Sequence, residues 1–396
     1  MSKMHTLFSV YGIEAEYMIV DKDSLNVLPI ADKILAQLNG GTITNEVEQG
    51  SVAWSNELVN HVLEIKCAHP VQSIVGMDEV FHTSILQINA LLAQYNAVLM
   101  PTAMHPWFEP SQMQLWPHGQ REIYHLYHEI FDCRGHGWSN LQSVHINLPY
   151  ANEEEFKLLH SAIRVVLPMI PYFAASSPYF DAQKGDLADN RLAFYEKNQI
   201  KVPSIIGNII PEFVENTQQY HKILQGIYKD IAHYDHAKTL QNPWLNSRAA
   251  IPKFDVGAIE IRLMDIQESP YMDFCIVSLI TCIIEQLIQD TSKHTRMFLA
   301  SDKLLRKVYD ASKTYEPQID AKEYFEIFKL SDCYNWTDFI KELVNIHTSY
   351  VNKRYHRGLE VLLQKGNLAK RLTQKQLSKE MYKKLVTCLF ENNIYV

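Results

Sequence analysis

Four short stretches of the chain place a carboxylate or a histidine at alternate positions of an otherwise apolar, strand-like run. These stretches are residues 12–20 with Glu14 and Glu16, residues 63–65 with Glu64, residues 143–148 with His145, and residues 258–263 with Glu260 and Arg262. Side chains at i and i+2 of a strand point to one face, so Glu14 lies beside Glu16 and Glu260 beside Arg262. Such a face suits hard divalent cations and the phosphates that they carry.

Each of these patterns also has a purely structural explanation, which stays open at this point. Two alternate glutamates fit the solvent face of an antiparallel strand. Glu260 and Arg262 fit a surface ion pair of little energetic consequence. His145 fits a satisfied core or surface histidine, although Ser143 and Asn147 share its face. As a ligand, its imidazole suits Mn²⁺ and less readily Mg²⁺.

A further acid, Glu57, precedes Glu64 by seven residues. An unbroken strand would direct the two side chains to opposite faces. Either a bulge intervenes or Glu57 lies just before the strand, so we rank Glu64 above Glu57 as a ligand.

Two arginines lie in segments that we predict to be loops. Arg191 belongs to the long polar segment 176–203, and Arg134 stands in the Gly- and His-containing segment 133–138. A loop arginine is usually solvated, but its planar fork also fits a bidentate clamp for a carboxylate or a phosphate. Long loops in compact domains tend to be functional.

The elements that must position these groups alternate without the βαβ rhythm of a parallel sheet. We predict strands over 8–20, 58–66, 97–100 and 141–148 and within 249–265. We predict helices over 31–38, 77–96 and 120–131, from Asn152 towards Pro168, over 217–240, and almost throughout from Pro270 onward. Strands with one polar face indicate an antiparallel sheet backed by helices.

Composition narrows the class of protein. The chain has 396 residues, of which 47% are hydrophobic and 21% charged, as in an ordinary globular protein. The net charge of −8 gives no uniformly basic surface for nucleic acid. Six scattered cysteines indicate reduced thiols, and the most apolar run, 274–288, is too short to span a bilayer and predicts a buried helix. We therefore expect a cytoplasmic protein without a nucleic-acid or membrane partner.

The chain lacks the common nucleotide and hydrolase signatures. It has no Walker A sequence, no G-x-G-x-x-G, no kinase signature, no G-x-S-x-G and no H-E-x-x-H. If the protein handles ATP, it must do so through carboxylates bridged by metal ions.

Together these segments resemble the glutamate–cysteine ligase type 2 family of carboxylate–amine ligases. The family signature G-[IV]-E-x-E corresponds to residues 12–16, and the family's acid before an L-E-[IF] strand corresponds to Glu57 and residues 63–65. The V-H-[VI]-x strand of the family corresponds to residues 144–147, and its S-P-x-[FW] segment before an arginine corresponds to residues 177–180 and Arg191. The last motif, the strand G-x-[IL]-E-[VI]-R-x-x-D, corresponds to residues 257–265. Order and spacing match over about residues 8–290. Asp189-Asn190 and 134–137 depart from the commonest family forms, in places where the amino-acid substrates would be held.

The resemblance implies a glutamine-synthetase-like α+β fold, in which a curved antiparallel sheet forms a half-open funnel with helices packed outside. We expect residues 1–300 to form the catalytic domain and residues 301–396 a helical C-terminal cap of the same domain. The resemblance also implies two or three Mg²⁺ or Mn²⁺ ions held by Glu14, Glu16, Glu57, Glu64, His145 and Glu260. Arg134, Arg191 and Arg262 are the expected ATP-binding residues. Of these, Arg262 would stabilise the transferring phosphoryl group, and Arg191 would hold phosphate or a substrate carboxylate.

The implied activity is ATP-dependent formation of an amide, a γ-glutamyl bond, through an acyl phosphate, with glutamate as the acid and cysteine as the amine. Two other hypotheses remain: a ligase of the same mechanism for another acid or amine, and a catalytically silent protein that binds an amino acid or a nucleotide. A metal-dependent amide hydrolase is a weaker alternative and would need no ATP. Whether the chain forms a homo-oligomer is left open.

Overall fold

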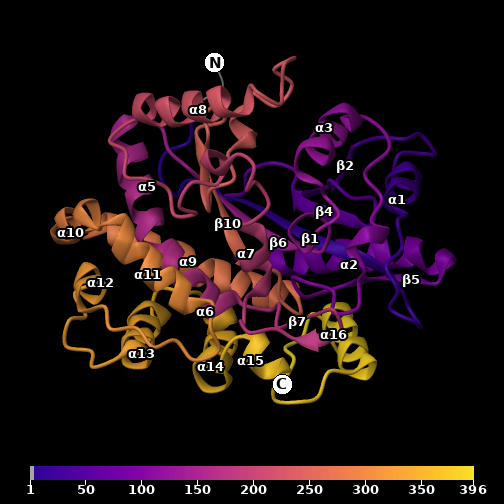
Figure 1. The fold of residues 1–396 in the computed structure, drawn as a ribbon. Coiled ribbons are helices and arrows are strands. Elements are labelled where there is room, and N and C mark those ends of the chain that lie inside the picture. Colours follow the sequence, from indigo (N-terminus) through magenta and orange to yellow (C-terminus); the bar gives the residue numbers. More distant parts are fainter. Residues whose placement is uncertain (1–3) are drawn as a thin grey trace.

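The computed structural model describes residues 4–396, and its centre is a large antiparallel sheet (Figure 1). The strand order is β2-β3-β4-β1-β6-β10-β9, and β5 pairs with the second half of β1. The strands are β1 (Gly12–Asp21), β2 (Glu46–Gln49), β3 (Val52–Asn56), β4 (Val62–Cys67), β5 (Ala97–Met100), β6 (Ser143–Pro149), β9 (Ala250–Lys253) and β10 (Ala258–Asp265). Because β2 and β9 remain as edges, the sheet is not closed. The expected fold class, an open antiparallel sheet with helices packed outside, is confirmed.

One face of the sheet is apolar and is covered by helices. Ile13, Ala15, Tyr17 and Ile19 alternate along β1, point to this face and are buried. The helices α1 (Ala31–Leu38), α2 (Met77–Leu92), α5 (Glu153–Val166) and α6 (Ile170–Ala174) pack on strands of the sheet, and α9 (Pro270–Gln289) packs on α2, α5 and α6. The alternation that makes one face apolar therefore leaves the other face for polar groups.

The helix α9 is longer than the apolar run from which it was predicted. Among the described residues it is the one helix long and apolar enough to cross a membrane, and 78% of its most apolar window is buried inside the protein. The argument that this segment is too short to span a bilayer is therefore wrong. The prediction of a buried core helix is confirmed by its packing.

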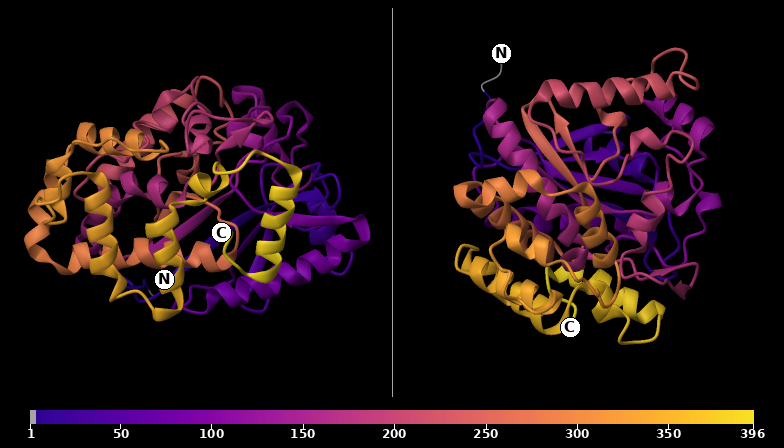
Figure 2. Two further views of the ribbon diagram at one scale, coloured as in Figure 1. Left: turned by 90° about the horizontal axis from the view of Figure 1, so that it is seen from below. Right: turned by 60° about the vertical axis from the view of Figure 1, so that its left-hand side comes forward.

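The opposite face of β1 changes its character along the strand. Glu14 and Glu16 occupy its first half, whereas Met18 and Val20 pack with Leu372 and Leu385 of the C-terminal helices. The expected polar face is thus confined to the first half of β1. The C-terminal helices cover the second half of this face. They lie below the sheet in Figure 1 and in front of it in the left view of Figure 2.

The segment after residue 300 is helical, as predicted. It contains α11 (Asp302–Ser312), α12 (Lys322–Ile327), α13 (Trp336–Thr348), α14 (His356–Lys365), α15 (Leu368–Leu372) and α16 (Lys379–Glu391). A single cluster of buried apolar side chains includes residues on both sides of residue 300. This continuity supports our proposal that 301–396 is a cap of the same domain.

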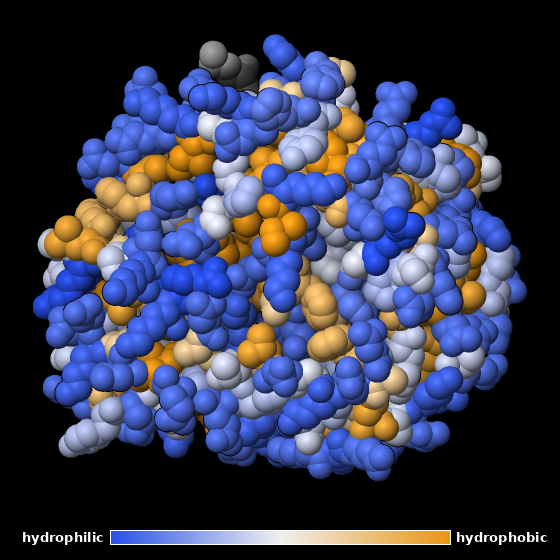
Figure 3. All heavy atoms as spheres, viewed as in Figure 1, coloured by the Kyte–Doolittle hydropathy of each residue, from blue (hydrophilic) through white to orange (hydrophobic). Residues whose placement is uncertain are grey.

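Further helices border the polar face. They are α3 (Arg121–Phe131), α4 (His136–Ser139), α7 (Asn190–Tyr195) and α8 (Thr217–Ile231), and α10 (His294–Leu299) follows α9. The surface on this side is mostly hydrophilic, and apolar side chains show in the recess below α8 (Figure 3).

Three predicted segments differ from the structure. The predicted strand 58–66 begins only at Val62, because residues 57–61 form the connection of a hairpin between β3 and β4. The predicted loop 176–203 contains the hairpin of β7 (Tyr179–Phe180) and β8 (Gln183–Lys184) and the helix α7, whose first turn is capped by the Asp189 carboxylate. The predicted helix 217–240 ends at Ile231, because the buried carboxylate of Asp235 accepts the backbone N–H groups of Thr239 and Leu240 and holds a turn there.

Candidate active site

The register of the sheet brings the chemically active side chains of four strands together. Glu14 of β1 lies opposite His145 of β6, and Glu16 lies opposite Glu64 of β4. On the far side of β6, Glu260 of β10 lies opposite Asn147. Directly opposed residues share a face of the sheet, so these six strand positions converge on one polar surface.

Ser143 and His145 tie the neighbouring strands together. The backbone N–H and the hydroxyl of Ser143 donate to Glu16 Oε2 at 2.7 and 3.0 Å. The His145 ring lies between Ser143 Oγ, 3.0 Å from Nε2, and Glu14 Oε2, 3.4 Å from Nδ1. Glu16, Glu64, His145 and Glu260 are all buried, so these groups are not the solvent face of a strand.

Glu57 reaches the same surface from the end of β3. Ser55 lies opposite Glu64 and donates to its Oε1 at 2.8 Å, and Glu57 follows Ser55 by two residues. The two acids therefore share a face because Glu57 directly follows β3, and β3 pairs with the strand of Glu64 in one hairpin. As expected, Glu57 lies shortly before the strand of Glu64 in the chain, but it also directly follows another strand, β3.

The acids form two overlapping groups with spacing suited to metal ions. One ligand atom from each of Glu14, Glu64 and His145 lies within 4.8 Å of the others, and the same holds for Glu16, Glu57 and Glu64. Ligands about 2.1 Å from one octahedral ion are at most about 4.2 Å apart, so each group needs only small side-chain adjustments to hold an ion. Glu64 belongs to both groups and would bridge them.

The charges of the acids are not balanced within the cluster. Burial and the neighbouring charge of Glu16 raise the pKa of Glu57 to about 8. Burial and the charges of Glu14 and Glu57 raise the pKa of Glu64 well above its usual value. A divalent cation at either group would remove this repulsion. The hard oxygen donors and the single imidazole fit Mg²⁺ or Mn²⁺.

The pKa values of Glu14 and His145 shift so that the charged forms of both groups are favoured. Burial alone would raise the pKa of Glu14, but the hydrogen bond from His145 and the charge of Lys253 lower it. Burial alone would lower the pKa of His145, but its hydrogen bond to Glu14 and the charges of Glu260 and Glu16 raise it. An ion held by this pair would have to displace the imidazole proton, because only the neutral ring has a free lone pair.

Two cations flank Glu260. Arg262 Nε lies 3.1 Å from Glu260 Oε1 without hydrogen-bond geometry, and the Lys253 ammonium pairs with Glu260 Oε2. A bulge in β10 between Ile261 and Met264 surrounds Arg262 and adjusts its direction.

Two cavities open beside the cluster. One has a volume of about 370 Å³ and is lined by Glu16, Glu57, His145, Arg191 and Arg262 together with aromatic side chains of α3 and α4. The other has a volume of about 790 Å³ and is lined by Glu14, Asn147 and Lys253 and by the loop 254–256. The cluster therefore has room on both sides for organic substrates.

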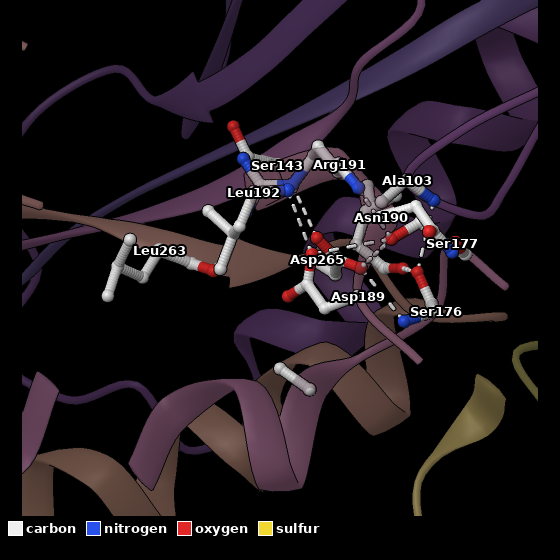
Figure 4. Close-up of polar contacts among 12 residues, drawn as sticks. Ala103, Ser143, Ser176, Ser177, Asp189, Asn190, Arg191, Leu192, Leu263 and Asp265 are labelled. Atoms are coloured by element: carbon white, nitrogen blue, oxygen red, sulfur yellow. Dashed lines mark hydrogen bonds and ion pairs between the residues drawn. The ribbon is translucent and has the colours of Figure 1, made fainter. Parts of the chain in front are cut away.

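Arg191 lies at the wall of the smaller cavity, on α7 and not on a flexible loop. Its Nε donates to the buried carboxylate of Asp265, and its Nη2 donates to the Leu263 carbonyl at 2.7 Å (Figure 4). Ser176 N–H and Ser177 Oγ donate to the second oxygen of Asp265 at 2.8 and 2.9 Å. Nη1 makes no hydrogen bond within residues 4–396, so it remains available to a ligand in the cavity.

The structure brings all predicted ligands and two of the three arginines together, but not Arg134. The Arg134 guanidinium is exposed and pairs with Asp132, and Arg134 lines neither cavity. Its predicted part in nucleotide binding finds no support in its position and stays a prediction.

Two lysines of the site were not predicted. Lys66 follows Glu64 by two residues on the same face and lies 3.4 Å from it, so the period of the strand was a sufficient signal. Lys253 lies on β9, and no feature of its own segment marks it. Its place depends on the pairing of β9 with β10.

Comparison with known proteins gives one family and several relatives. The family model described as Glutamate-cysteine ligase family 2 matches residues 10–324. An uncharacterized protein of Archaeoglobus fulgidus is 31% identical over 391 residues, covering 97% of this chain and 100% of that protein. A Bradyrhizobium diazoefficiens protein named "Putative glutamate--cysteine ligase 2" is 26% identical over 254 residues, which are 60% of this chain and 53% of that protein.

Two solved structures share the fold. The glutamate–cysteine ligase of Francisella tularensis, solved in complex with AMP, superposes with a TM-score of 0.64 at 14% identity and covers 98% of this chain and 90% of its own. A bifunctional glutathione synthetase from Pasteurella multocida gives a TM-score of 0.61 at 12% identity, covering 98% of this chain and 52% of its own. At these identities the likeness shows the fold alone.

Proposed function

The chain belongs to glutamate-cysteine ligase family 2, and we propose that it is an ATP-dependent ligase that joins glutamate to cysteine through an acyl phosphate. The observation that carries the proposal is the cluster of buried carboxylates around Glu64, with Arg262 at the wall of the adjoining cavity. A protein of the same fold that holds AMP agrees with a nucleotide substrate.

The metal ligands in this proposal are Glu14, Glu64 and His145 for one ion and Glu16, Glu57 and Glu64 for another. Bound Mg²⁺ or Mn²⁺ would supply charge neutralisation for the ATP phosphates. Ser55 and Ser143 hold Glu64 and Glu16 in place by hydrogen bonds at 2.8 and 3.0 Å. Such supporting contacts fix the direction of the ligand carboxylates.

Both arginines of the smaller cavity serve the anionic groups of the substrates. Arg262 would donate to the phosphoryl group in transfer, where preorganised donors act most strongly. Arg191 would hold a substrate carboxylate or phosphate through its free Nη1, because Asp265 and the Leu263 carbonyl already fix its other nitrogens. We therefore place the amino acids in the smaller cavity and the larger nucleotide in the cavity of about 790 Å³.

The reaction has two balanced steps. An oxygen of the γ-carboxylate of glutamate attacks the γ-phosphorus of ATP, the bond to the β,γ-bridging oxygen breaks, and ADP leaves. The amine nitrogen then attacks the acyl carbon, the carbon–oxygen bond to the phosphate breaks, and inorganic phosphate leaves as the nitrogen loses a proton to solvent. We further propose that the enzyme acts in the cytoplasm on these small molecules.

A substrate screen tests the proposal. Purified protein with Mg²⁺, ATP, glutamate and cysteine should release ADP and phosphate and form a product of the mass of γ-glutamylcysteine. Cysteine is then replaced by other amines and glutamate by other acids. ADP release with a different pair would retain the ligase and correct its substrates, whereas AMP and pyrophosphate would exclude the acyl-phosphate route. Absence of nucleotide turnover with every pair would favour the catalytically silent alternative.

A further inference from the structure

Lys253 reaches the carboxylate cluster across the hairpin of β9 and β10. The turn of this hairpin uses Gly257 with φ +62, where an added Cβ would lie 2.9 Å from the Tyr150 carbonyl oxygen. The hairpin sets Lys253 opposite Ala258 and Ile251 opposite Glu260. Lys253 is therefore the diagonal neighbour of Glu260 on the polar face, a separation that a long side chain spans.

The ammonium of Lys253 contacts two acids from different strands. It lies 3.3 Å from Glu14 Oε1 and forms a close ion pair with Glu260 Oε2. The other oxygen of Glu260 faces Arg262 Nε at 3.1 Å and His145 Nδ1 at 4.0 Å. Both oxygens of Glu260 are thus already beside positively charged groups or an imidazole of the protein.

This arrangement sets Glu260 apart from the other acids. Within residues 4–396, the two groups with metal-ligand spacing contain Glu14, Glu16, Glu57, Glu64 and His145 but not Glu260. Glu14, His145 and Glu260 would form a third group of two carboxylates and an imidazole, and the space between its two carboxylates is where the Lys253 ammonium lies.

We propose that Lys253 is a built-in cation that takes the place of a third metal ion, so that the cluster binds two divalent ions and not three. The inference rests on the proposed function in that it takes the cluster to be the metal site. In it, Glu260 positions Lys253 and Arg262, and the metal ligands are the five other residues.

A tethered ammonium competes well with a free ion. Its local concentration is fixed by the strand that carries it, whereas a divalent ion must be drawn from solution. The two cannot share the place, because an ion about 2.1 Å from the same oxygens would meet the ammonium at repulsive distance. Removing the ammonium would leave Glu14 Oε1 and Glu260 Oε2 without the cation that lies between them, which favours a divalent ion there.

Counting bound Mn²⁺ tests the inference without any turnover. Metal-free, full-length protein is titrated with MnCl₂ in the absence of ATP, and the free ion is measured by its electron paramagnetic resonance signal. The wild type should bind two Mn²⁺ per chain. Lys253→Met should bind three, with the added ion held at least tenfold more tightly than any third ion of the wild type.

Three further variants control the count. Lys253→Arg keeps the charge and should stay at two. Lys66→Met removes a lysine that contacts Glu64 but is also held by Glu46 at 2.5 Å outside the cluster, and it should stay at two as well. Lys253→Ser repeats the test if methionine prevents folding, which circular dichroism shows.

Three Mn²⁺ in the wild type, or two in both Lys253→Met and Lys253→Ser, would overturn the inference. The count is independent of the reaction. A wild type that binds two Mn²⁺ but turns over no ATP with any acid and amine would refute the proposed function and leave the inference intact.

Discussion

Replacing Asp265 by asparagine removes the negative partner of a buried arginine while it keeps the shape of the side chain. Asp265 is fully buried, and its two oxygens accept from Arg191 Nε, the Ser176 N–H and the Ser177 hydroxyl. Asparagine offers one oxygen and one NH₂ group, so at least one of these donors loses its acceptor. The Arg191 guanidinium, 2% exposed, would keep its charge without the carboxylate that balances it.

The expected loss follows from the burial of the pair. Removing one partner of a buried ion pair costs roughly 3–5 kcal/mol of folding free energy. Asp189 reduces this cost, because burial and the charge of Asp265 raise its pKa to about 8. Without Asp265, the Asp189 carboxyl ionises more readily and supplies part of the counter-charge. We therefore expect Asp265→Asn to lower the free energy of unfolding by about 3 kcal/mol at pH 7, the lower end of that range.

Urea denaturation followed by circular dichroism measures the loss, and two double variants assign it. Asp189→Asn combined with Asp265→Asn removes the reserve carboxyl and should lose more than Asp265→Asn alone. Arg191→Met combined with Asp265→Asn removes both charges and should recover most of the loss. A loss below about 1 kcal/mol for Asp265→Asn would refute the reasoning, since that is the range of an exposed pair.

Three other predictions follow from the same geometry. Glu64→Gln should abolish turnover and weaken Mn²⁺ binding at both sites, because both groups of ligands share Glu64. The control variant Glu46→Gln removes only the outer partner of Lys66 and should leave Mn²⁺ binding near the wild-type value. Equal Mn²⁺ affinity in Glu64→Gln and the wild type would show that Glu64 is a structural residue and not a metal ligand. Arg262→Lys should lower kcat by about 10²-fold or more and change the KM for ATP less, because lysine lacks the planar fork that matches phosphate oxygens; a rate within about twofold of the wild type would make Arg262 a mere ion-pair partner of Glu260. For Asp189 the folded-state pKa of about 8 lies well above the ordinary value of an aspartate, about 3.9, so the stability associated with its protonated form is complete below pH 4 and is lost as the pH rises towards 8. Asp189→Asn should therefore match the wild type near pH 4 and be more stable by at least about 1 kcal/mol at pH 7, and parallel stability curves over this range would contradict the shift.

The polar residues that gather on one face of the sheet could be predicted because their signal is local. Glu14, Glu16, His145 and Glu260 stand at alternate positions of apolar strands, and the period of two is a property of the strand itself. The family resemblance then indicated which of these polar positions belong to one site. The antiparallel open sheet followed from the same pattern of one polar and one apolar face.

The remaining features depend on contacts between distant segments. Lys253 enters the cluster only through the pairing of β9 with β10, and Glu57 shares the face of Glu64 only because a hairpin lies between them. Arg191 is buried by Asp265, 74 residues away in the chain, so its own polar segment resembled a loop. The guanidinium of Arg134 is of the type that binds phosphate or carboxylate ligands, but it already pairs with Asp132 at the surface.

Transfer of oxygen from the acid to phosphate tests the central claim most directly. Glutamate labelled with ¹⁸O in its γ-carboxylate is turned over with ATP, Mg²⁺ and cysteine, and the phosphate is analysed by mass spectrometry. A ligase that forms an acyl phosphate must leave one ¹⁸O in each inorganic phosphate, because the carboxylate oxygen that attacks the γ-phosphorus departs with it. Amide formation that leaves unlabelled phosphate, or places the label in AMP, would contradict the account.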